Sequence, residues 1–231
     1  MRTQGDHTMH HAMIEVPAGR VTLSDRRTER SWAVDVGPFA LGAVPVTQGL
    51  YEQVMGGRPS TAHGDRLPVE GVSWGDAVRF CGALSVREGL RPAYRVPADD
   101  ADAEAPEWDR TADGYRLPTE AEWEHACRAG TTEPRYGPLD EIAWHRGNSG
   151  ERLREAGGRR PNDWGLHDML GNVWEWCWDV YDPEVYGSYR VLRGGGWFDE
   201  HWSCRASVRR RSHPTLRIDD VGFRLARTLP G

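Results

Sequence analysis

GLHDMLGNVWEW, residues 165–176, is the most informative stretch of this chain. It holds two tryptophans, two acidic residues and two glycines within twelve positions. Glycine lets the backbone turn tightly or approach a ligand, carboxylates supply hard oxygen ligands, and indole rings anchor loops. The stretch therefore predicts a tightly folded, loop-rich segment that carries the donor atoms of a metal or active site.

The composition extends this expectation to the whole chain. Its 231 residues include 11 Trp but only 4 Phe, together with 27 Gly and 15 Pro. Such a composition favours a fold that is rich in turns, has few long helices and is held together by large aromatic side chains. We expect a single domain over residues 13–231, preceded by a flexible tail over residues 1–12.

Several classes of protein are excluded by simple observations. No apolar run approaches the roughly 20 residues that span a bilayer, and no signal peptide is visible. We therefore expect a cytoplasmic protein that does not bind membranes. We also expect the protein to be bacterial. The net charge of −6 argues against a nucleic-acid partner. The chain has no lysine, which excludes Schiff-base chemistry. The four cysteines form no C-x-x-C pair and are expected to be buried free thiols.

The local patterns predict three helices and several short strands. The helices are expected over residues 48–55, 74–87 and 120 to about 128, behind the N-caps Thr47, Ser73 and Thr119. Residues 97–106 are acidic and aperiodic, which predicts an exposed excursion. Residues 221–226 alternate as one strand that closes the domain.

Six motifs in order identify a family. They are Pro45–Gln48, Pro68–Trp74, Tyr115–Glu124, Gly171–Trp176, Arg193–Trp197 and Gly222–Arg224. Together they resemble the formylglycine-generating enzyme family, also called the sulfatase-modifying-factor family, over nearly the whole chain. The resemblance implies an α+β fold with low regular secondary structure, namely the elaborated C-type-lectin-like fold of the formylglycine-generating enzyme type. It does not fix the function, because the family includes copper-dependent oxidases, iron-dependent sulfoxide synthases and ligand-binding proteins.

The copper chemistry of the family's oxidases is not expected here. Those enzymes bind copper through two cysteines that follow a Gly-Gly-Ser-aromatic motif, and soft thiolates suit Cu(I). In this chain Gly196 takes the place of the serine, Asp199 takes the place of the first cysteine, and the second cysteine is missing. Cys204 corresponds to a later position outside the pair. The resemblance therefore predicts that the catalytic cysteine pair is absent.

The sequence is compatible with a site for another metal. The resemblance implies a calcium site made by Asp168, Gly171, Val173 and Glu175, through two side chains and two backbone carbonyls. The alternative is that Asp168 and Glu175 cap turns or pair with arginines. Copper or iron at Asp199 and His201 is a second option, although their spacing is not diagnostic.

Two functions remain as hypotheses. In the first, the domain is a binding module for a small molecule, protein or peptide, and its ligand-binding residues are Trp197, Asp199, His201, Trp202 and Arg209. In the second, it is an oxidoreductase with altered metal chemistry that acts on a small-molecule or peptide precursor, with Asp199 and His201 as the catalytic candidates. The sequence does not predict the oligomeric state.

Overall fold

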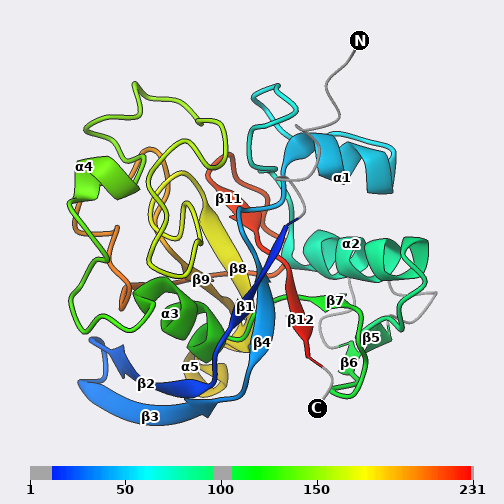
Figure 1. Cartoon of the computed structure of the whole chain (residues 1–231), viewed down its shortest axis with the longest axis horizontal. Coiled ribbons are helices and arrows are strands. Elements are labelled where there is room, and N and C mark those ends of the chain that lie inside the picture. Colours follow the sequence, from blue (N-terminus) through cyan, green and yellow to red (C-terminus); the bar gives the residue numbers. More distant parts are fainter. Residues whose placement is uncertain (1–11, 96–105, 230–231) are drawn as a thin grey trace.

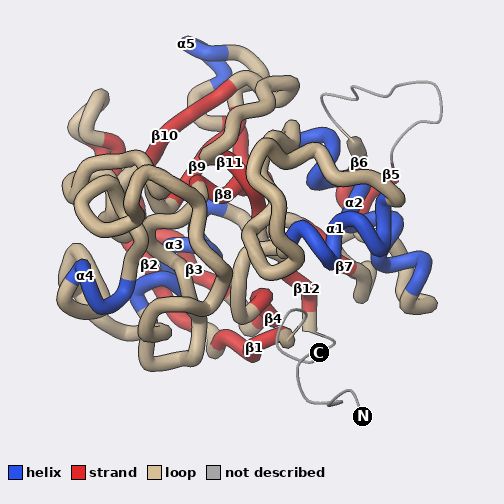
Figure 2. The backbone as a smooth tube through the Cα atoms, turned by 90° about the horizontal axis from the view of Figure 1, so that it is seen from above, coloured by secondary structure: helices blue, strands red, loops and turns tan. Residues whose placement is uncertain are grey.

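The computed structural model describes residues 12–95 and 106–229. Within these ranges the chain forms short strands and helices joined by long loops, as Figures 1 and 2 show. The predicted α+β class with low regular secondary structure is confirmed. Residues 1–11 of the predicted tail and nearly all of the acidic segment 97–106 lie outside the described residues.

Two four-stranded sheets organise the fold. The first has the order β1 (Met13–Val16), β4 (Phe39–Gly42), β12 (Ala226–Thr228) and β7 (Tyr115–Arg116). The second has the order β10 (Arg209–Ser212), β9 (Arg190–Arg193), β8 (Trp174–Val180) and β11 (Val221–Phe223). Only the β8–β11 pair is parallel among the strand pairs of the described residues.

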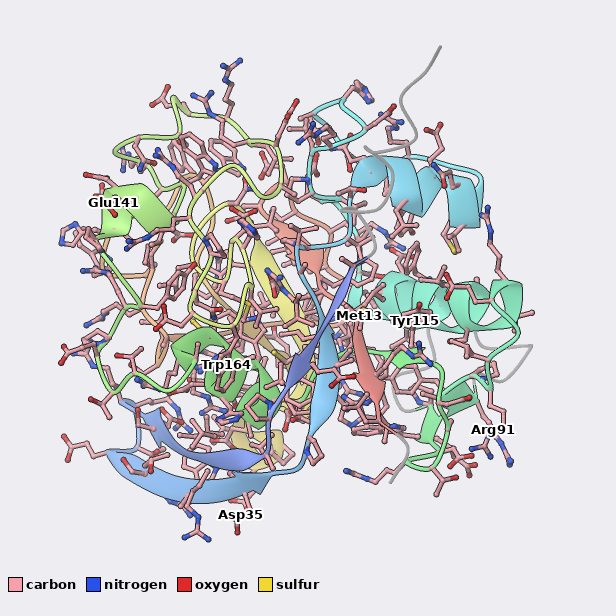
Figure 3. The ribbon with its side chains drawn as sticks, in the orientation of Figure 1. Met13, Asp35, Arg91, Tyr115, Glu141 and Trp164 are labelled. Carbon is pink, nitrogen blue, oxygen red and sulfur yellow. The ribbon has the colours of Figure 1, made fainter. Side chains whose placement is uncertain are left out.

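Two short hairpins complete the strands. One consists of β2 (Gly19–Asp25) and β3 (Arg30–Val36), and the other of β5 (Tyr94–Arg95) and β6 (Glu107–Trp108). The β2–β3 hairpin packs against α3 (Glu120–Arg128), below it in Figure 1. Asp35 marks the outer edge of this hairpin in Figure 3, where its exposed carboxylate pairs with Arg20.

The three predicted helices form with the predicted caps. They are α1 (Gln48–Met55), α2 (Trp74–Arg87) and α3. The side chains of Thr47, Ser73 and Thr119 each accept a hydrogen bond from a backbone N–H in the first turn. The helices begin there because these bonds satisfy donors that lack an intrahelical partner. The remaining helices are single turns, α4 (Leu139–Ile142) and α5 (Pro183–Tyr186).

The single closing strand predicted over residues 221–226 is wrong. The segment divides at Arg224 into β11 and β12, which belong to different sheets. Arg224 breaks the alternation because its fully buried side chain donates to the carbonyl oxygens of Gly42 and His167, both at 2.8 Å. A buried guanidinium needs such partners, so the chain turns at this residue instead of continuing as one strand.

Buried tryptophans connect the loops to the core. The indole N–H of Trp74 donates to the Cys177 carbonyl oxygen, and that of Trp176 donates to the Val72 carbonyl oxygen, each at 3.0 Å. Both rings lie in the cluster that α2 packs against. A second cluster contains Trp123 and surrounds α3. The tryptophan-rich composition is therefore explained by rings that fill the core while their N–H groups hold loop carbonyls.

The cysteines and the helices bear on two predictions made from the sequence. All four cysteines are buried and free, as expected. Among the described residues, no helix combines the length and apolar character needed to cross a membrane.

Candidate functional site

The segment with the most exposed aromatic side chains follows β9 and is called loop 197–205 here. Three glycines lead into it, and Gly195 has a φ of +86°. A Cβ at Gly195 would lie 2.9 Å from the Cys204 Sγ, which closes the far end of the loop. Glycine is required at this position because both the backbone angle and the close approach exclude a side chain.

Asp199 attaches this loop to the motif that opens β8. Its Oδ2 accepts hydrogen bonds from the Trp174 indole N–H at 2.6 Å and from the Gly196 N–H at 2.8 Å. Its backbone oxygen accepts from the Arg146 N–H at 2.9 Å. Asp199 therefore positions the loop, and one of its carboxylate oxygens is already committed to that role.

The loop presents aromatic rings to solvent. Phe198 is 48% exposed and Trp202 is 54% exposed. The Arg146 guanidinium lies 5.0 Å from the centre of the Phe198 ring, and His201 packs edge-on against Trp202. Trp32 is the only other exposed tryptophan of the described chain, and a group of exposed rings is typical of an interaction surface.

Arginines fix the backbone beneath these rings. Arg135 donates to the carbonyl oxygens of His201 at 2.6 Å and Cys204 at 2.9 Å. The Arg205 Nε donates to the Trp202 carbonyl oxygen at 2.7 Å. Because its backbone is held in this way, the loop loses little conformational entropy when it contacts a ligand.

The remaining two predicted binding residues have different surroundings. Trp197 is partly buried, and its indole N–H donates to the Asp219 carbonyl oxygen at 3.2 Å. Arg209 is on β10 and donates to both carboxylate oxygens of Glu120, at 2.5 and 2.8 Å. Its side chain is only 7% exposed, so Arg209 is held mainly within the protein.

The structure brings only part of the predicted set together. Trp202 and Arg209 line a small pocket of about 240 Å³. Arg209 also lines a cavity of about 1030 Å³ on the side of the β2–β3 hairpin. Neither Trp197 nor Asp199 lines either of them. Four of the five residues therefore lie on loop 197–205, and Arg209 lies on β10 at the small pocket that Trp202 also lines.

One of the four predicted calcium ligands, Glu175, belongs to a buried ion pair. Glu175 accepts hydrogen bonds from the Trp123 indole N–H at 2.7 Å and from Arg224, whose Nη2 is 2.8 Å from Oε1. This is the arginine pairing that the sequence left as the alternative. We call Glu175, Arg224 and Trp123 the Glu175 cluster.

Asp168 is less completely satisfied. Its Oδ2 accepts from the Gly157 N–H at 2.6 Å, whereas its Oδ1 is buried without a hydrogen-bond partner. Burial raises the pKa of this carboxyl to about 6. Gly171, between the two acidic residues, has a φ of +77°, and a Cβ there would lie 2.2 Å from the Trp144 carbonyl oxygen. An orphaned carboxylate oxygen beside a tightly turned backbone fits a hard cation.

Thiolate ligands for copper are not available near the loop. Burial, with a smaller effect from Asp199, raises the pKa of the Cys204 thiol to about 12, so this group stays protonated at neutral pH. Across residues 12–95 and 106–229, no group of three or more His, Cys, Asp or Glu side chains is placed to hold a metal ion.

Sequence reasoning missed two features of this region. Phe198 was not selected, although it follows Trp197 directly and is among the most exposed apolar side chains of the described chain. The large cavity was not foreseen either, because its walls come from segments far apart in the sequence, including β3, α3 and the end of β8. No local pattern signals such a meeting of distant segments.

The geometry defines a class of protein: a loop-rich α+β scaffold that carries a rigid, aromatic surface loop. The sequence profile described as "Sulfatase-modifying factor enzyme 1-like domain" matches residues 2–229. The chain belongs to this family, and its fold is the C-type-lectin-like fold of the formylglycine-generating enzyme type.

Three comparisons illustrate the range of the family. The chain is 32% identical to the chaperone protein LppX of Paenibacillus barcinonensis, over 98% of this chain and 92% of that protein. It is 32% identical to hercynine oxygenase of Mycolicibacterium smegmatis over 84% of this chain, but it spans only about half (54%) of that enzyme. Among solved structures, variable protein 1 of Treponema denticola superposes with a TM-score of 0.86 at 33% identity, covering 93% and 94% of the two chains.

Proposed function

We propose that this protein is a binding module and that loop 197–205 contacts a protein or peptide ligand. The observation that carries the proposal is the exposure of Phe198 and Trp202 on a backbone that Arg135 and Arg205 hold in place. Large aromatic side chains on a pre-organised loop supply contact area at a low entropic cost.

The similarity to LppX supports a protein ligand, because that relative is named a chaperone and matches nearly the full chain. The similarity to variable protein 1 covers nearly the full length of both chains, so nearly the whole of this chain forms the shared scaffold that presents loop 197–205. Neither name identifies the ligand of this protein.

The alternative function is an oxidoreductase with altered metal chemistry. The specific observation in its favour is the similarity to hercynine oxygenase, which is restricted to about half of that enzyme. Against it, Asp199 is engaged by Trp174 and Gly196, and within residues 12–95 and 106–229 no group of three His, Cys, Asp or Glu side chains is placed to hold copper or iron beside His201.

A structural calcium ion belongs to the same proposal. Asp168 and Glu175 would supply side-chain oxygens, and Gly171 and Val173 would supply backbone carbonyls. The supporting observation is the buried, unpartnered Oδ1 of Asp168. Calcium would neutralise this carboxylate and stabilise the loop that leads into β8, and it would take no part in a reaction.

Site-specific photocrosslinking tests the ligand-binding proposal. A benzophenone amino acid replaces Glu200, which lies between the two exposed rings, and the protein is irradiated in an extract of its native host. The matched control carries the same group at Val86, which is 67% exposed on α2. We expect a discrete crosslinked species from position 200 only, which disappears when Trp202→Ala is added. A species that forms equally at position 86, or that survives Trp202→Ala, contradicts the proposal.

A further inference from the structure

The larger of the two cavities that Arg209 lines is on the side of the β2–β3 hairpin. Its volume is about 1030 Å³, and its walls are the β2–β3 hairpin, the first turn of α3, the end of β8 and α5. These elements occupy the same lower part of the molecule in Figure 1. Arg209 and Tyr181 also line the small pocket beside Trp202, but no residue of loop 197–205 lines this cavity. We call this space the hairpin cavity.

Most charges in the wall of the hairpin cavity are paired. Arg209 binds both carboxylate oxygens of Glu120, and Arg116 binds both oxygens of Glu122 at 2.7 Å. Arg27 pairs with Asp182. Seven acidic side chains line the space, and five of them pair with an arginine, which leaves Asp179 and Glu184.

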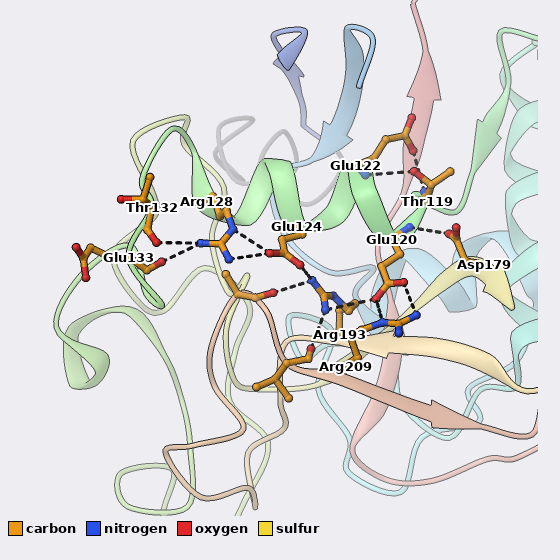
Figure 4. A network of polar contacts seen from close by, with 12 residues as sticks. Thr119, Glu120, Glu122, Glu124, Arg128, Thr132, Glu133, Asp179, Arg193 and Arg209 are labelled. Carbon is orange, nitrogen blue, oxygen red and sulfur yellow. Dashed lines mark hydrogen bonds and ion pairs between the residues drawn. The ribbon is translucent and has the colours of Figure 1, made fainter. Parts of the chain in front are cut away.

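Asp179 is the carboxylate in this wall that stands out. Figure 4 shows it beside the first turn of α3, where its Oδ2 accepts a hydrogen bond from the Glu120 N–H at 2.6 Å. Among the described residues, no arginine or histidine lies within ion-pair distance of it. Burial, and then the neighbouring Glu120 carboxylate, raise the pKa of Asp179 to about 6. Asp179 thus lacks the arginine partner that Asp25, Glu120 and Glu122 have in the same wall.

Aromatic rings line the same cavity. Trp32 on β3 is 38% exposed, and Tyr181 follows Asp179 by two residues at the end of β8. The guanidinium of Arg209 already lies 5.3 Å from the Trp32 ring centre and 4.5 Å from that of Tyr181 while it pairs with Glu120. The protein's own side chains thus show how this wall holds a cation, between a carboxylate and aromatic faces.

We propose that the hairpin cavity binds a small organic cation, an amine or a guanidine, with its charged group at Asp179 and its apolar part against Trp32. The volume is sufficient for a small organic molecule, and the unpaired carboxylate with nearby rings is the chemistry that recognises such cations. This binding site is independent of the ligand surface on loop 197–205.

Calorimetric titration with matched probes tests the charge requirement. The probes are phenethylamine and agmatine as cations, 2-phenylethanol as the uncharged analogue and phenylacetate as the anion. We expect at least one cation to bind saturably at pH 7.5, and phenethylamine to bind roughly tenfold or more tightly than 2-phenylethanol, since a hydrogen bond between charged groups is involved. Saturable binding of neither cation, or equal binding of phenylacetate, overturns the proposal.

Variants of the wall locate the bound cation. Asp179→Asn keeps an acceptor for the Glu120 N–H and should weaken cation binding roughly tenfold or more. Glu184→Gln removes an exposed carboxylate from the same cavity and should change affinity by less than about twofold. Trp32→Leu provides a second test that leaves the buried carboxylate intact, and it should also weaken binding. Equal effects of Asp179→Asn and Glu184→Gln would contradict the assignment.

A last variant separates the two proposals. Trp202→Ala removes an exposed ring of loop 197–205 that does not line the hairpin cavity. It should leave cation binding unchanged while it abolishes the crosslink described above. Loss of cation binding in Trp202→Ala would contradict a separate site even if the ligand-binding loop were correct.

Discussion

The Glu175 cluster and loop 197–205 are both rich in aromatic and charged residues, but they use them in opposite ways. In the cluster, Glu175, Arg224 and Trp123 are fully buried or nearly so, and the carboxylate is bonded by both partners. In the loop, arginines bond the backbone and leave the rings of Phe198 and Trp202 in solvent. The family motif therefore forms part of the buried core, whereas the proposed function assigns ligand recognition to the exposed rings of loop 197–205.

Breaking the buried ion pair should have the largest effect. Glu175→Ala leaves the Arg224 guanidinium buried without its carboxylate, which typically costs about 3–5 kcal/mol of unfolding free energy. Urea denaturation at pH 7 measures the loss. Asp35→Ala, which breaks an exposed pair with Arg20, is the control and should change stability little. Similar effects of the two variants would remove the distinction between scaffold and surface.

Adding or removing calcium should change the thermal stability of the protein if Asp168 and Glu175 bind this ion. If Asp168 and Glu175 hold calcium, a free concentration one hundredfold above the dissociation constant stabilises the fold by about 2.7 kcal/mol. Differential scanning calorimetry should show a higher melting temperature with calcium than with EDTA, and Asp168→Asn should reduce the difference. Identical melting curves in calcium and EDTA would rule out a structural calcium site.

Asp179 differs from Glu175 in that, among the described residues, no arginine pairs with its carboxylate. Its pKa is raised from 3.8 to about 6 by burial and by Glu120, with Glu122 adding to the effect. The folded state therefore favours the protonated form, so this stabilising contribution is full below about pH 4 and is lost as the pH rises through about 6.

The pH effect is measured by difference. The unfolding free energy of Asp179→Asn minus that of the wild type should increase from pH 4.5 to pH 7.5 by on the order of 1–3 kcal/mol. Urea denaturation at the two pH values gives this quantity. A difference that does not change with pH would show that Asp179 is not destabilised when it ionises.

Trp202 should give the smallest change in stability. Trp202→Ala removes a ring that is 54% exposed, so the unfolding free energy should change by no more than about 0.5 kcal/mol. The matched variant Trp123→Ala removes a fully buried ring and should cost about 3–5 kcal/mol. Thermal or urea denaturation compares them. A large loss in Trp202→Ala would make loop 197–205 part of the scaffold.

The sequence predicted the local elements better than the path of the chain. The caps at Thr47, Ser73 and Thr119 were predictable because each bond joins residues a few positions apart. The division at Arg224 was not, because its partners Gly42 and His167 are distant in the sequence. Alternation alone describes a strand and carries no information about a buried guanidinium.

The residues of the candidate binding sites were likewise predictable only where they are neighbours in the sequence. The aromatic character of loop 197–205 could be read from its residues, and Trp202 is exposed as a binding residue should be. Arg209 and Trp197 were grouped with Trp202 because they are close to it in the sequence. In the structure, the Arg209 guanidinium donates to the Glu120 carboxylate, and the Trp197 indole N–H donates to the Asp219 carbonyl oxygen. The hairpin cavity could not be predicted, since Trp32 and Asp179 meet only through the tertiary fold.

Elemental analysis of the purified protein distinguishes a binding module from a metal-dependent oxidoreductase. The protein is expressed with copper and iron supplied and compared with an Asp199→Ala/His201→Ala double variant. If loop 197–205 is a binding surface, neither protein carries stoichiometric copper or iron. One equivalent of either metal in the wild type, lost in the double variant, would contradict the binding-module account and favour a metal-dependent oxidoreductase.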